Sequence, residues 1–265
     1  MREFSEDYLR RTRVGMWDDS REALEPLELR SRDRVLDVGC GTGELSRVLA
    51  AECSGKVVGC DADPTLLRPA REHVPAVAGD ARRLPFPDGA FDLVVCQALL
   101  INLPDPEAAV SEFARVSADL VAAIEPDNGA VEVDSSVDAE APLERRARRA
   151  YLEGVPTDVT LGAGAKTAFT GADLDVLETR RYDHVRTIAP PYDERALTTA
   201  RRKATGSGLA DDRDTLLESD LSEEEYDALR SDWRAMGRDV IEQMSDRDYR
   251  RTETVPFYVT VGRVP

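Results

Sequence analysis

The stretch VLDVGCGTGELS, from Val35 to Ser46, decides the fold class. It begins with an apolar run, breaks into three alternating glycines and continues with helix-favouring residues, which predicts a strand, a tight turn and a helix. Further apolar runs follow at 57–60, 74–78, 91–96 and 119–125, with helical segments near 43–52, 64–72 and 106–116. Because these runs are apolar throughout, we expect parallel strands covered by helices on both faces, in a doubly wound α/β sheet.

This regular alternation stops after about residue 128. A helix-like stretch covers 139–152, and a loop rich in glycine and threonine follows it. Strands are predicted over 174–187 and 254–263, with an acidic helical insert between them. The second part of the chain therefore adds helices and two more strands to the sheet.

The acidic insert contains one strong helix signal. Ser222 and Glu225 have the spacing of a capping box, and Leu221 can pack on Tyr226 in the first turn. An apolar stripe continues at helical spacing through Tyr226, Leu229, Trp233, Met236, Val240 and Met244. Docking against a core is the simpler explanation of this stripe, and lining a substrate pocket is the alternative.

Gly39, Gly41 and Gly43 are spaced G-x-G-x-G, and this spacing restricts the ligand of the turn. A dinucleotide fingerprint needs its third glycine one position later, where this chain has Glu44. A phosphate-binding P-loop needs a lysine, and the turn has none. Glu44 also adds a negative charge at the start of the helix, where a pyrophosphate would bind. The turn therefore disfavours a diphosphate ligand.

Acidic residues lie near the ends of the first three predicted strands. Asp37 precedes the glycines, and Asp61 follows the second strand, where a carboxylate can accept both hydroxyls of a ribose. Asp80 follows the third strand, where a carboxylate can accept a hydrogen bond from an adenine amine. The pattern predicts a ligand with a ribose and an adenine but no diphosphate.

Four segments together resemble the successive motifs of class I S-adenosylmethionine-dependent methyltransferases. Within this class, they are most similar to the branch of ubiquinone/menaquinone-type small-molecule methyltransferases. They are VLDVGCGTGELS, GCDADP, GDARRLPFPDGAFDLVVCQALLINLPDP and IEPDN, within about 30–128. The resemblance implies a Rossmann-like, seven-stranded, mostly parallel sheet with the last strand antiparallel. It also implies S-adenosylmethionine as methyl donor and S-adenosylhomocysteine as product. The implied cofactor-binding residues are Asp37, Gly39, Gly41, Gly43, Asp61, Ala62, Asp80, Ala81 and Gln97.

The resemblance also implies which part of the cofactor these residues contact. Asp37, Gly39 and Gly41 lie against the methionine moiety, Asp61 binds the ribose, Ala62 flanks the adenine, and Asp80 with Ala81 binds the adenine edge. The chain departs from the family in two places. The segment RVSADL replaces a Pro-Gly-Gly turn, and Ile101-Asn102-Leu103 stands where a histidine is frequent. A catalytic histidine is therefore not carried over.

Candidate catalytic residues come from strand ends, because methyl transfer mainly requires alignment and desolvation of the acceptor. Gln97 can orient a group of the acceptor or the cofactor. Glu125 and Asp127 can act as a base or bind a cation, although ordinary strand-end acids explain them as well. Cys96 is expected to be a buried strand residue and not a nucleophile.

The expected organisation is a single domain in which segments flank a cofactor core. This domain covers residues 1–265. It comprises a helical cap over 1–30, an S-adenosylmethionine-binding core over 31–128, and substrate-side helical segments over 129–170 and 190–250. Tyr8, Arg11 and Trp17 of the cap can close over the site, although simple packing and surface charge explain them more readily.

The net charge of −17, with three lysines among 35 basic residues, restricts the partners. An acid-rich, lysine-poor chain resembles proteins of salt-loving archaea. Its negative field repels nucleic acids and anionic membranes, so we expect a small-molecule acceptor, although concentrated salt weakens that repulsion. No apolar run approaches the roughly 20 residues that span a bilayer. A cytoplasmic location is expected, and the cysteines and histidines lack the spacing of a metal site.

One basic cluster stands out in this acidic chain. The segment ERRARRA contains four arginines, Arg145, Arg146, Arg148 and Arg149. They are expected to form a solvated helix face. Alternatively, they bind an anionic group of the substrate. Two alternative functions also stay open at this point. They are a methyltransferase that acts on protein or tRNA, and an S-adenosylmethionine-binding protein without transferase activity.

Overall fold

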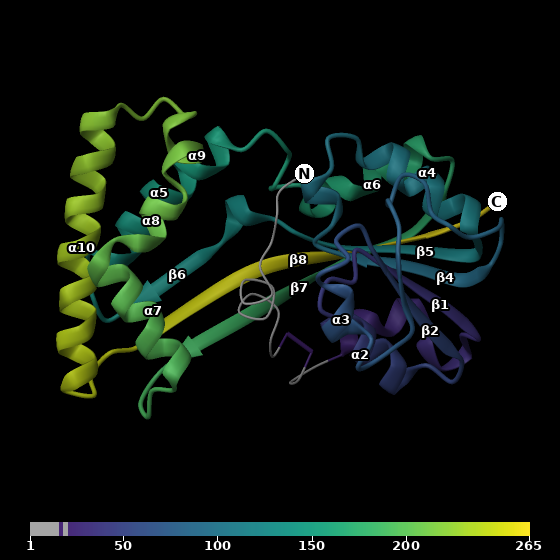
Figure 1. The fold of residues 1–265 in the computed structure, drawn as a ribbon, viewed down its shortest axis with the longest axis horizontal. Coiled ribbons are helices and arrows are strands. Elements are labelled where there is room, and N and C mark those ends of the chain that lie inside the picture. Colours follow the sequence, from purple (N-terminus) through teal and green to yellow (C-terminus); the bar gives the residue numbers. More distant parts are fainter. Residues whose placement is uncertain (1–15, 18–20) are drawn as a thin grey trace. The chain divides into compact units, whose positions relative to one another are not determined.

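The computed structural model describes residues 16–17 and 21–265, which divide into two compact units (Figure 1). Unit 1 lies within Met1–Asp127, Leu161–Tyr182 and Pro256–Pro265, and unit 2 comprises Asn128–Thr160 and Asp183–Val255. Among the residues described, no helix combines the length and the apolar character that a membrane crossing requires. Tyr8 and Arg11 lie outside the described residues, so their predicted role stays a prediction.

Unit 1 contains a sheet with the strand order β3-β2-β1-β4-β5-β8, in which β7 also pairs with β8. The strands are β1 (Arg34–Val38), β2 (Lys56–Asp61), β3 (Ala76–Ala78), β4 (Phe91–Gln97), β5 (Ser117–Pro126), β7 (Asp175–Ile188) and β8 (Arg251–Arg263), the last two shared with unit 2. The pairs among β1 to β5 are parallel, and β8 runs antiparallel to β5. This confirms the predicted seven-stranded, mostly parallel α/β sheet with an antiparallel last strand.

Helices cover both faces of this sheet, as Figure 1 shows for α2 and α3 on one side and α4 and α6 on the other. The helical elements of unit 1 are η1 (Glu22–Leu27), η2 (Leu29–Ser31), α2 (Glu44–Glu52), α3 (Leu67–Ala70), η3 (Leu100–Asn102), α4 (Pro106–Val116), η5 (Gly162–Gly164) and α6 (Ala165–Gly171). Asp105 caps α4 by accepting the Ala108 N–H at 3.0 Å. Phe113 of α4 and Phe169 of α6 are fully buried in the main core, beside Val94 of β4.

The N-terminal segment differs from the predicted helix. Within the described residues it forms the two short 3₁₀ helices η1 and η2 and no α-helix. Pro26 lies inside η1 and removes a backbone donor, and Glu28 between the two has φ of 52°, in the left-handed region. Both features interrupt a regular α-helix.

Unit 2 is mainly helical. Its elements are η4 (Asn128–Ala130), β6 (Glu132–Ser135), α5 (Glu140–Gly154), α7 (Glu194–Thr205), α8 (Ser207–Asp211), α9 (Arg213–Leu217) and α10 (Glu223–Ser245), and β6 pairs antiparallel with the start of β8. The predicted capping box at Ser222 and Glu225 is confirmed. The apolar stripe of α10 packs into two clusters of unit 2, with Trp233 only partly buried. Its docking role is therefore confirmed.

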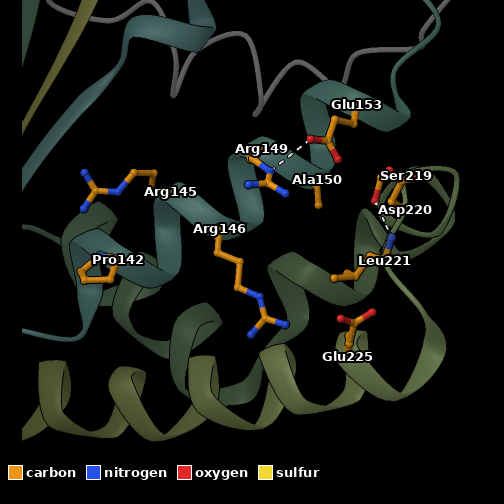
Figure 2. Close-up of a pocket in the computed structure, with 10 residues that line it drawn as sticks. All are labelled: Pro142, Arg145, Arg146, Arg149, Ala150, Glu153, Ser219, Asp220, Leu221 and Glu225. Atoms are coloured by element: carbon orange, nitrogen blue, oxygen red, sulfur yellow. Dashed lines mark hydrogen bonds and ion pairs between the residues drawn. The ribbon is translucent and has the colours of Figure 1, made fainter.

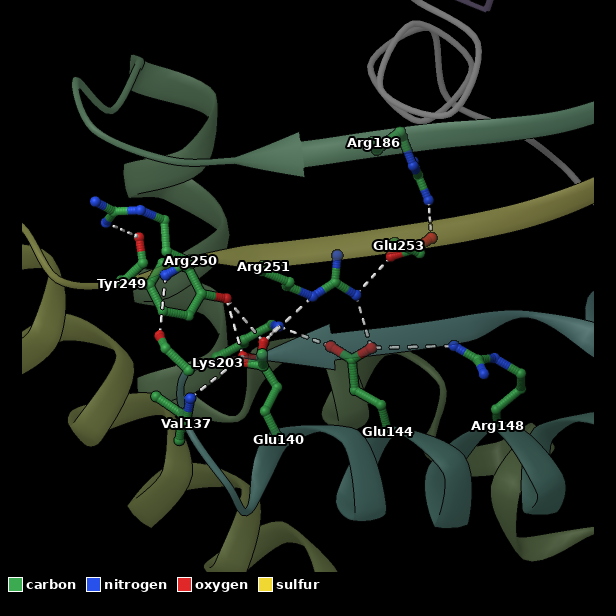
Figure 3. Close-up of polar contacts among 12 residues, drawn as sticks. Val137, Glu140, Glu144, Arg148, Arg186, Lys203, Tyr249, Arg250, Arg251 and Glu253 are labelled. Carbon is green, nitrogen blue, oxygen red and sulfur yellow. Dashed lines mark hydrogen bonds and ion pairs between the residues drawn. The ribbon is translucent and has the colours of Figure 1, made fainter.

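A buried network of charged side chains joins α5, α7 and β8 inside unit 2 (Figure 3). Lys203 pairs with Glu140 and, at 2.7 Å, with Glu144. Arg251 donates to Glu144 at 2.7 Å, and the Tyr249 hydroxyl lies 3.0 Å from both carboxylate oxygens of Glu140. Each of these five side chains is at least nine-tenths buried. A network with so many mutual partners fixes the packing of the helices around it.

Candidate functional site

The carboxyl ends of β1, β2 and β4 meet at one edge of the sheet in unit 1. Val38 pairs with Cys60 on one side and with Cys96 on the other, so the residues after these positions lie side by side. Gln97 of β4 pairs in turn with Ile124 of β5. This edge therefore brings together the glycine turn, Asp61, Gln97 and Glu125, as the sequence predicts for a doubly wound sheet.

The glycine turn needs two of its glycines for a physical reason. Gly39 has φ of 69°, and a side chain there would lie 2.9 Å from the Leu99 side chain. Gly43 has φ of 91°, and a side chain there would lie 3.0 Å from the Ala70 backbone. Both positions combine a left-handed backbone with a close neighbour, which only glycine accommodates without strain.

Asp37 and Asp61 are both tied to the strand–turn–helix unit. Asp37 is buried at the end of β1 and accepts a hydrogen bond of 2.5 Å from the Ser46 hydroxyl of α2. Asp61 accepts the Gly41 N–H at 2.8 Å with one oxygen and the Asp63 N–H at 2.9 Å with the other. A carboxylate has about four acceptor positions. Asp61 therefore keeps acceptor capacity for two hydroxyls while it shapes the turn.

Asp80 and its neighbours follow β3. Asp80 forms an ion pair with Arg82, with one Nη–Oδ distance of 2.8 Å. Hydrogen bonds from the Arg82 side chain and backbone lower the pKa of Asp80, so the carboxylate stays ionised and able to accept an amine hydrogen. Ala62 is exposed, whereas Ala81 is buried in the main core. The predicted adenine contacts of these residues stay a prediction.

Gln97 contacts the N-terminal segment. Its amide oxygen accepts from the Trp17 indole N–H at 3.4 Å, and its amide nitrogen lies 2.7 Å from the Met16 sulfur. Trp17 stacks on Tyr182 with ring centroids 5.2 Å apart and planes 19° apart, and the Tyr182 hydroxyl donates to the Met16 carbonyl. Within unit 1, a polar amide thus lies at the strand end beside a nearly parallel pair of aromatic rings.

Glu125 is fully buried at the end of β5. Its Oε1 accepts the Leu99 and Leu100 N–H groups at 3.0 and 2.9 Å, and its Oε2 accepts the Ile101 N–H at 3.2 Å. Burial raises the pKa of Glu125 to about 7, and these three donors oppose that rise. Since both oxygens are bound to backbone groups, this geometry favours a role in fixing the 99–101 turn over a role as base.

Glu125 therefore predicts a pH dependence of stability. Its folded-state pKa is about 7 and its ordinary value is 4.5, so its contribution to stability is fully present below 4.5 and is lost as the pH rises through about 7. We expect the free energy of unfolding to fall across this window by about 3 kcal/mol more in the wild type than in Glu125→Gln. Urea unfolding at constant salt, at one pH below and one above the window, measures the difference. Equal pH dependence in the two proteins would contradict the assignment.

Asp127 and Cys96 are two further polar residues near this edge of the sheet. Asp127 is partly buried, and its N–H donates to the Pro256 carbonyl at 2.9 Å. Burial, followed by the charge of Glu125, raises the pKa of the Cys96 thiol well above its ordinary value, which disfavours a thiolate nucleophile. Among the described residues, no group of histidine, cysteine and acidic side chains is placed to bind a metal ion.

Sequence reasoning missed several residues that shape this edge. Leu99 lies over Gly39, Tyr182 stacks on Trp17, and Met16 contacts Gln97. Ala98 has φ of 48°, which turns the chain sharply from β4 into η3. The Ala-Leu-Leu sequence after β4 carries no glycine that would signal this turn. Tyr182 lies far from the motif in the chain.

These residues fit S-adenosylmethionine better than a dinucleotide. Asp61 offers spare carboxylate capacity for a ribose, and the ionised Asp80 can accept from an adenine amine. Glu44, at the first turn of α2, accepts a 2.6 Å hydrogen bond from Thr42 within the glycine turn. Its negative charge at the helix N-terminus disfavours a diphosphate there. The chemistry of the donor set thus suits a cationic cofactor without phosphate.

Comparison with known proteins identifies the central part of unit 1. Residues 36–119 match the family described as "Methyltransferase domain". A demethylmenaquinone methyltransferase from Mycolicibacterium vanbaalenii is 40% identical over 97 residues, which cover 37% of this chain and 42% of that protein. The chain thus spans less than half the length of this relative.

Solved structures share the fold over much more of the chain. The YcgJ protein from Bacillus subtilis has a TM-score of 0.54 at 18% identity, over 91% of this chain and 96% of that one. The [4+2]-cyclase SpnF has a TM-score of 0.50 at 19% identity, over 92% of this chain and 78% of that one. The fold is therefore shared with a protein named as a cyclase, and it does not by itself define a reaction.

Proposed function

We propose that this chain, whose residues 36–119 match a methyltransferase domain, transfers a methyl group from S-adenosylmethionine to a planar, quinol-like small molecule. The observation that carries the proposal is the arrangement around Asp61. Its carboxylate binds the Gly41 N–H of the glycine turn and retains acceptor positions for a ribose. A carboxylate that can bind a ribose lies next to a glycine turn that is unsuited to a diphosphate. This combination supports S-adenosylmethionine as the methyl donor.

The donor site is proposed to consist of the predicted cofactor residues. Bound S-adenosylmethionine supplies an activated methyl carbon. Asp37, buried and bonded to Ser46, fixes the end of β1 against α2 and so sets the path of the glycine turn toward the methionine moiety. Asp61 orients the ribose, and Asp80 accepts from the adenine amine. The chain's contribution is alignment, which is the main requirement of an in-line displacement.

The acceptor class is proposed from two observations. A relative that is 40% identical over 97 residues is named for demethylmenaquinone, a quinone. Trp17 and Tyr182 form a stacked aromatic pair beside the Gln97 amide, which suits a flat ring with an oxygen substituent. In this proposal Gln97 orients the acceptor oxygen, and the methyl group replaces a proton of the acceptor. Asp127, the partly buried strand-end acid, receives that proton.

Two alternatives from the sequence predict different behaviour. A protein or tRNA methyltransferase needs attraction to a large, often anionic, partner, which the net charge of −17 disfavours. A cofactor-binding protein without transfer would bind S-adenosylhomocysteine and produce no methylated compound. The acid-rich composition supports function in a salt-rich cytoplasm, so the tests belong in concentrated potassium chloride.

The proposal is tested with 1,4-naphthohydroquinone as acceptor probe under anaerobic conditions. Incubation with S-adenosylmethionine is expected to yield S-adenosylhomocysteine and a singly methylated naphthalene product, both detected by mass spectrometry. Because the chain has two tryptophans, Trp233→Phe leaves Trp17 as the single reporter. We expect the probe to quench the Trp17 fluorescence of that variant.

The results separate the two parts of the proposal. Binding of S-adenosylhomocysteine by calorimetry, without methylated product and without quenching of Trp17, would overturn the acceptor class and leave a cofactor-binding protein. Failure to bind S-adenosylhomocysteine in concentrated salt would overturn the donor assignment as well.

A further inference from the structure

A hollow in unit 2 is lined by three arginines of one helix (Figure 2). Arg145, Arg146 and Arg149 come from α5, and the segment Ser219–Leu221 with Glu225 of α10 forms the opposite wall. The cavity has a volume of about 490 Å³, within the range of small-molecule sites. It is formed by unit 2 alone and contains none of the residues assigned to the donor or acceptor.

The four arginines of ERRARRA separate into two groups. Arg148 turns inward, donates to the Val131 carbonyl at 2.9 Å and lies 4.0 Å from Glu144. Arg149 pairs with Glu153 at 3.1 Å along the exposed helix face. Neither Arg145 nor Arg146 has a hydrogen bond or ion pair with any residue that the structure describes. Two guanidinium groups thus line the hollow without a hydrogen-bond partner in the part of the chain that the structure describes.

The acidic residues of the hollow do not neutralise these two arginines by direct contact. Glu225 is bound by the capping box, where its Oε2 accepts from the Ser222 N–H at 3.0 Å and from the Ser222 hydroxyl at 2.7 Å. Glu153 is the partner of Arg149, and Asp220 is exposed. Figure 2 shows Arg146 extending toward α10 without an ion pair to Glu225; hydrogen bonds from Ser222, and then the charge of Arg146, lower the pKa of Glu225. The three arginines are matched in number by Glu153, Asp220 and Glu225, so the positive charge is concentrated on the α5 wall of the hollow and is not in excess over the whole hollow.

The spacing on α5 adds a reason for an anion. Arg145 and Arg149 are four residues apart on one helix, and like charges at this spacing destabilise a helix by a few tenths of a kcal/mol. An anion placed between them removes this repulsion. Guanidinium groups offer planar, paired donors that match carboxylate and phosphate oxygens. In a chain with 52 acidic and 35 basic residues, three arginines on one wall of a hollow are a local concentration of positive charge.

We propose that this hollow is a binding site for a small organic anion bearing a phosphate or carboxylate group. Arg145 and Arg146 bind the anionic group, and Arg149 adds positive charge beside it. Ala150, Leu221 and Pro142 supply an apolar surface for the rest of the ligand. The Asp220 carboxylate at the rim accepts a hydroxyl or ammonium hydrogen of the same ligand. The site is separate from methyl transfer and does not depend on the proposed function.

The test measures binding of inorganic pyrophosphate and, separately, of citrate to the full chain by calorimetry at fixed ionic strength. Pyrophosphate represents a phosphate ligand and citrate a carboxylate ligand. We expect at least one probe to bind the wild type. The double variant Arg145→Gln/Arg146→Gln is expected to bind it at least about tenfold more weakly, since it loses two charge-assisted contacts.

The matched control is Arg195→Gln/Arg201→Gln, which removes the same charge from exposed positions of α7 in the same unit. This control is expected to bind the probe with wild-type affinity. Equal weakening in both double variants would show a general charge effect and overturn the site. Absence of binding by both probes in the wild type would overturn it as well. Thermal unfolding of each variant without probe verifies that the fold is intact.

Discussion

Replacing Lys203 by methionine is expected to lower the free energy of unfolding by about 3–5 kcal/mol, which is typical of breaking a buried ion pair from one side. Lys203 is 7% exposed and pairs with both Glu140, which is fully buried, and Glu144; Arg251 also pairs with both carboxylates. Without Lys203, two carboxylates remain buried in unit 2 with one positive charge fewer to offset the cost of burying them. Burial alone would raise the pKa of Glu144, yet Lys203 and Arg251 lower it, so the pair of cations keeps this carboxylate ionised.

Urea unfolding followed by circular dichroism measures this effect, with Arg202→Met as the matched control. Arg202 is the preceding residue on α7 and pairs with Asp211 at 2.7 Å, but both side chains are at least one-third exposed. An exposed pair contributes about 0–1 kcal/mol, so the control is expected to unfold almost as the wild type does. A similar loss in the two variants would mean that burial of the network is not what stabilises unit 2.

The double variant Glu140→Gln/Lys203→Met keeps the test informative if the single variant does not fold. It removes one buried negative charge together with the cation, and the glutamine can still accept from the Tyr249 hydroxyl, which lies 3.0 Å from both oxygens of Glu140. We expect part of the lost stability to return. No recovery would indicate that Lys203 acts mainly through Glu144 or through packing.

This network illustrates what the sequence could not predict. Glu140, Lys203 and Arg251 come from separate elements, and no local pattern marks them as partners. The short strand β6 was also missed, because its four residues are partly or fully exposed and carry no apolar run. It forms through pairing with Arg251–Thr254 at the start of β8. Both features depend on contacts between distant parts of the chain.

The strands of unit 1, in contrast, were predictable because each buried parallel strand is a continuous apolar run bounded by turn residues. The same holds for the order of polar residues along the edge, since the residue after each strand must lie there. Local chemistry was less predictable. Glu125 resembled a candidate base, yet three backbone N–H groups from 99–101 bind its oxygens. Only the turn at Ala98 brings those groups to it.

Asp61→Ala is expected to weaken binding of S-adenosylhomocysteine by about 100-fold, or about 2.7 kcal/mol. Hydrogen bonds to a charged group contribute about 1.5–3 kcal/mol each, and the variant removes the proposed acceptor of two ribose hydroxyls. It also removes the acceptor of the Gly41 N–H, which is bound at 2.8 Å and helps to fix the glycine turn. Calorimetry in concentrated salt measures the change.

The control for this prediction is Asp63→Ala. Asp63 is the next acid along the chain, but within the described residues its side chain accepts only from Thr65, with Oδ1 bound to the backbone N–H at 2.8 Å and to the hydroxyl at 2.7 Å. Its loss should change affinity by no more than about threefold, because it alters one local turn.

Asp61→Asn retains the shape and one acceptor oxygen, so its affinity should lie between those of Asp61→Ala and the wild type. Wild-type affinity in Asp61→Ala would show that the ribose is bound elsewhere. Equal losses in Asp61→Ala and Asp63→Ala would trace the effect to the turn and not to the carboxylate.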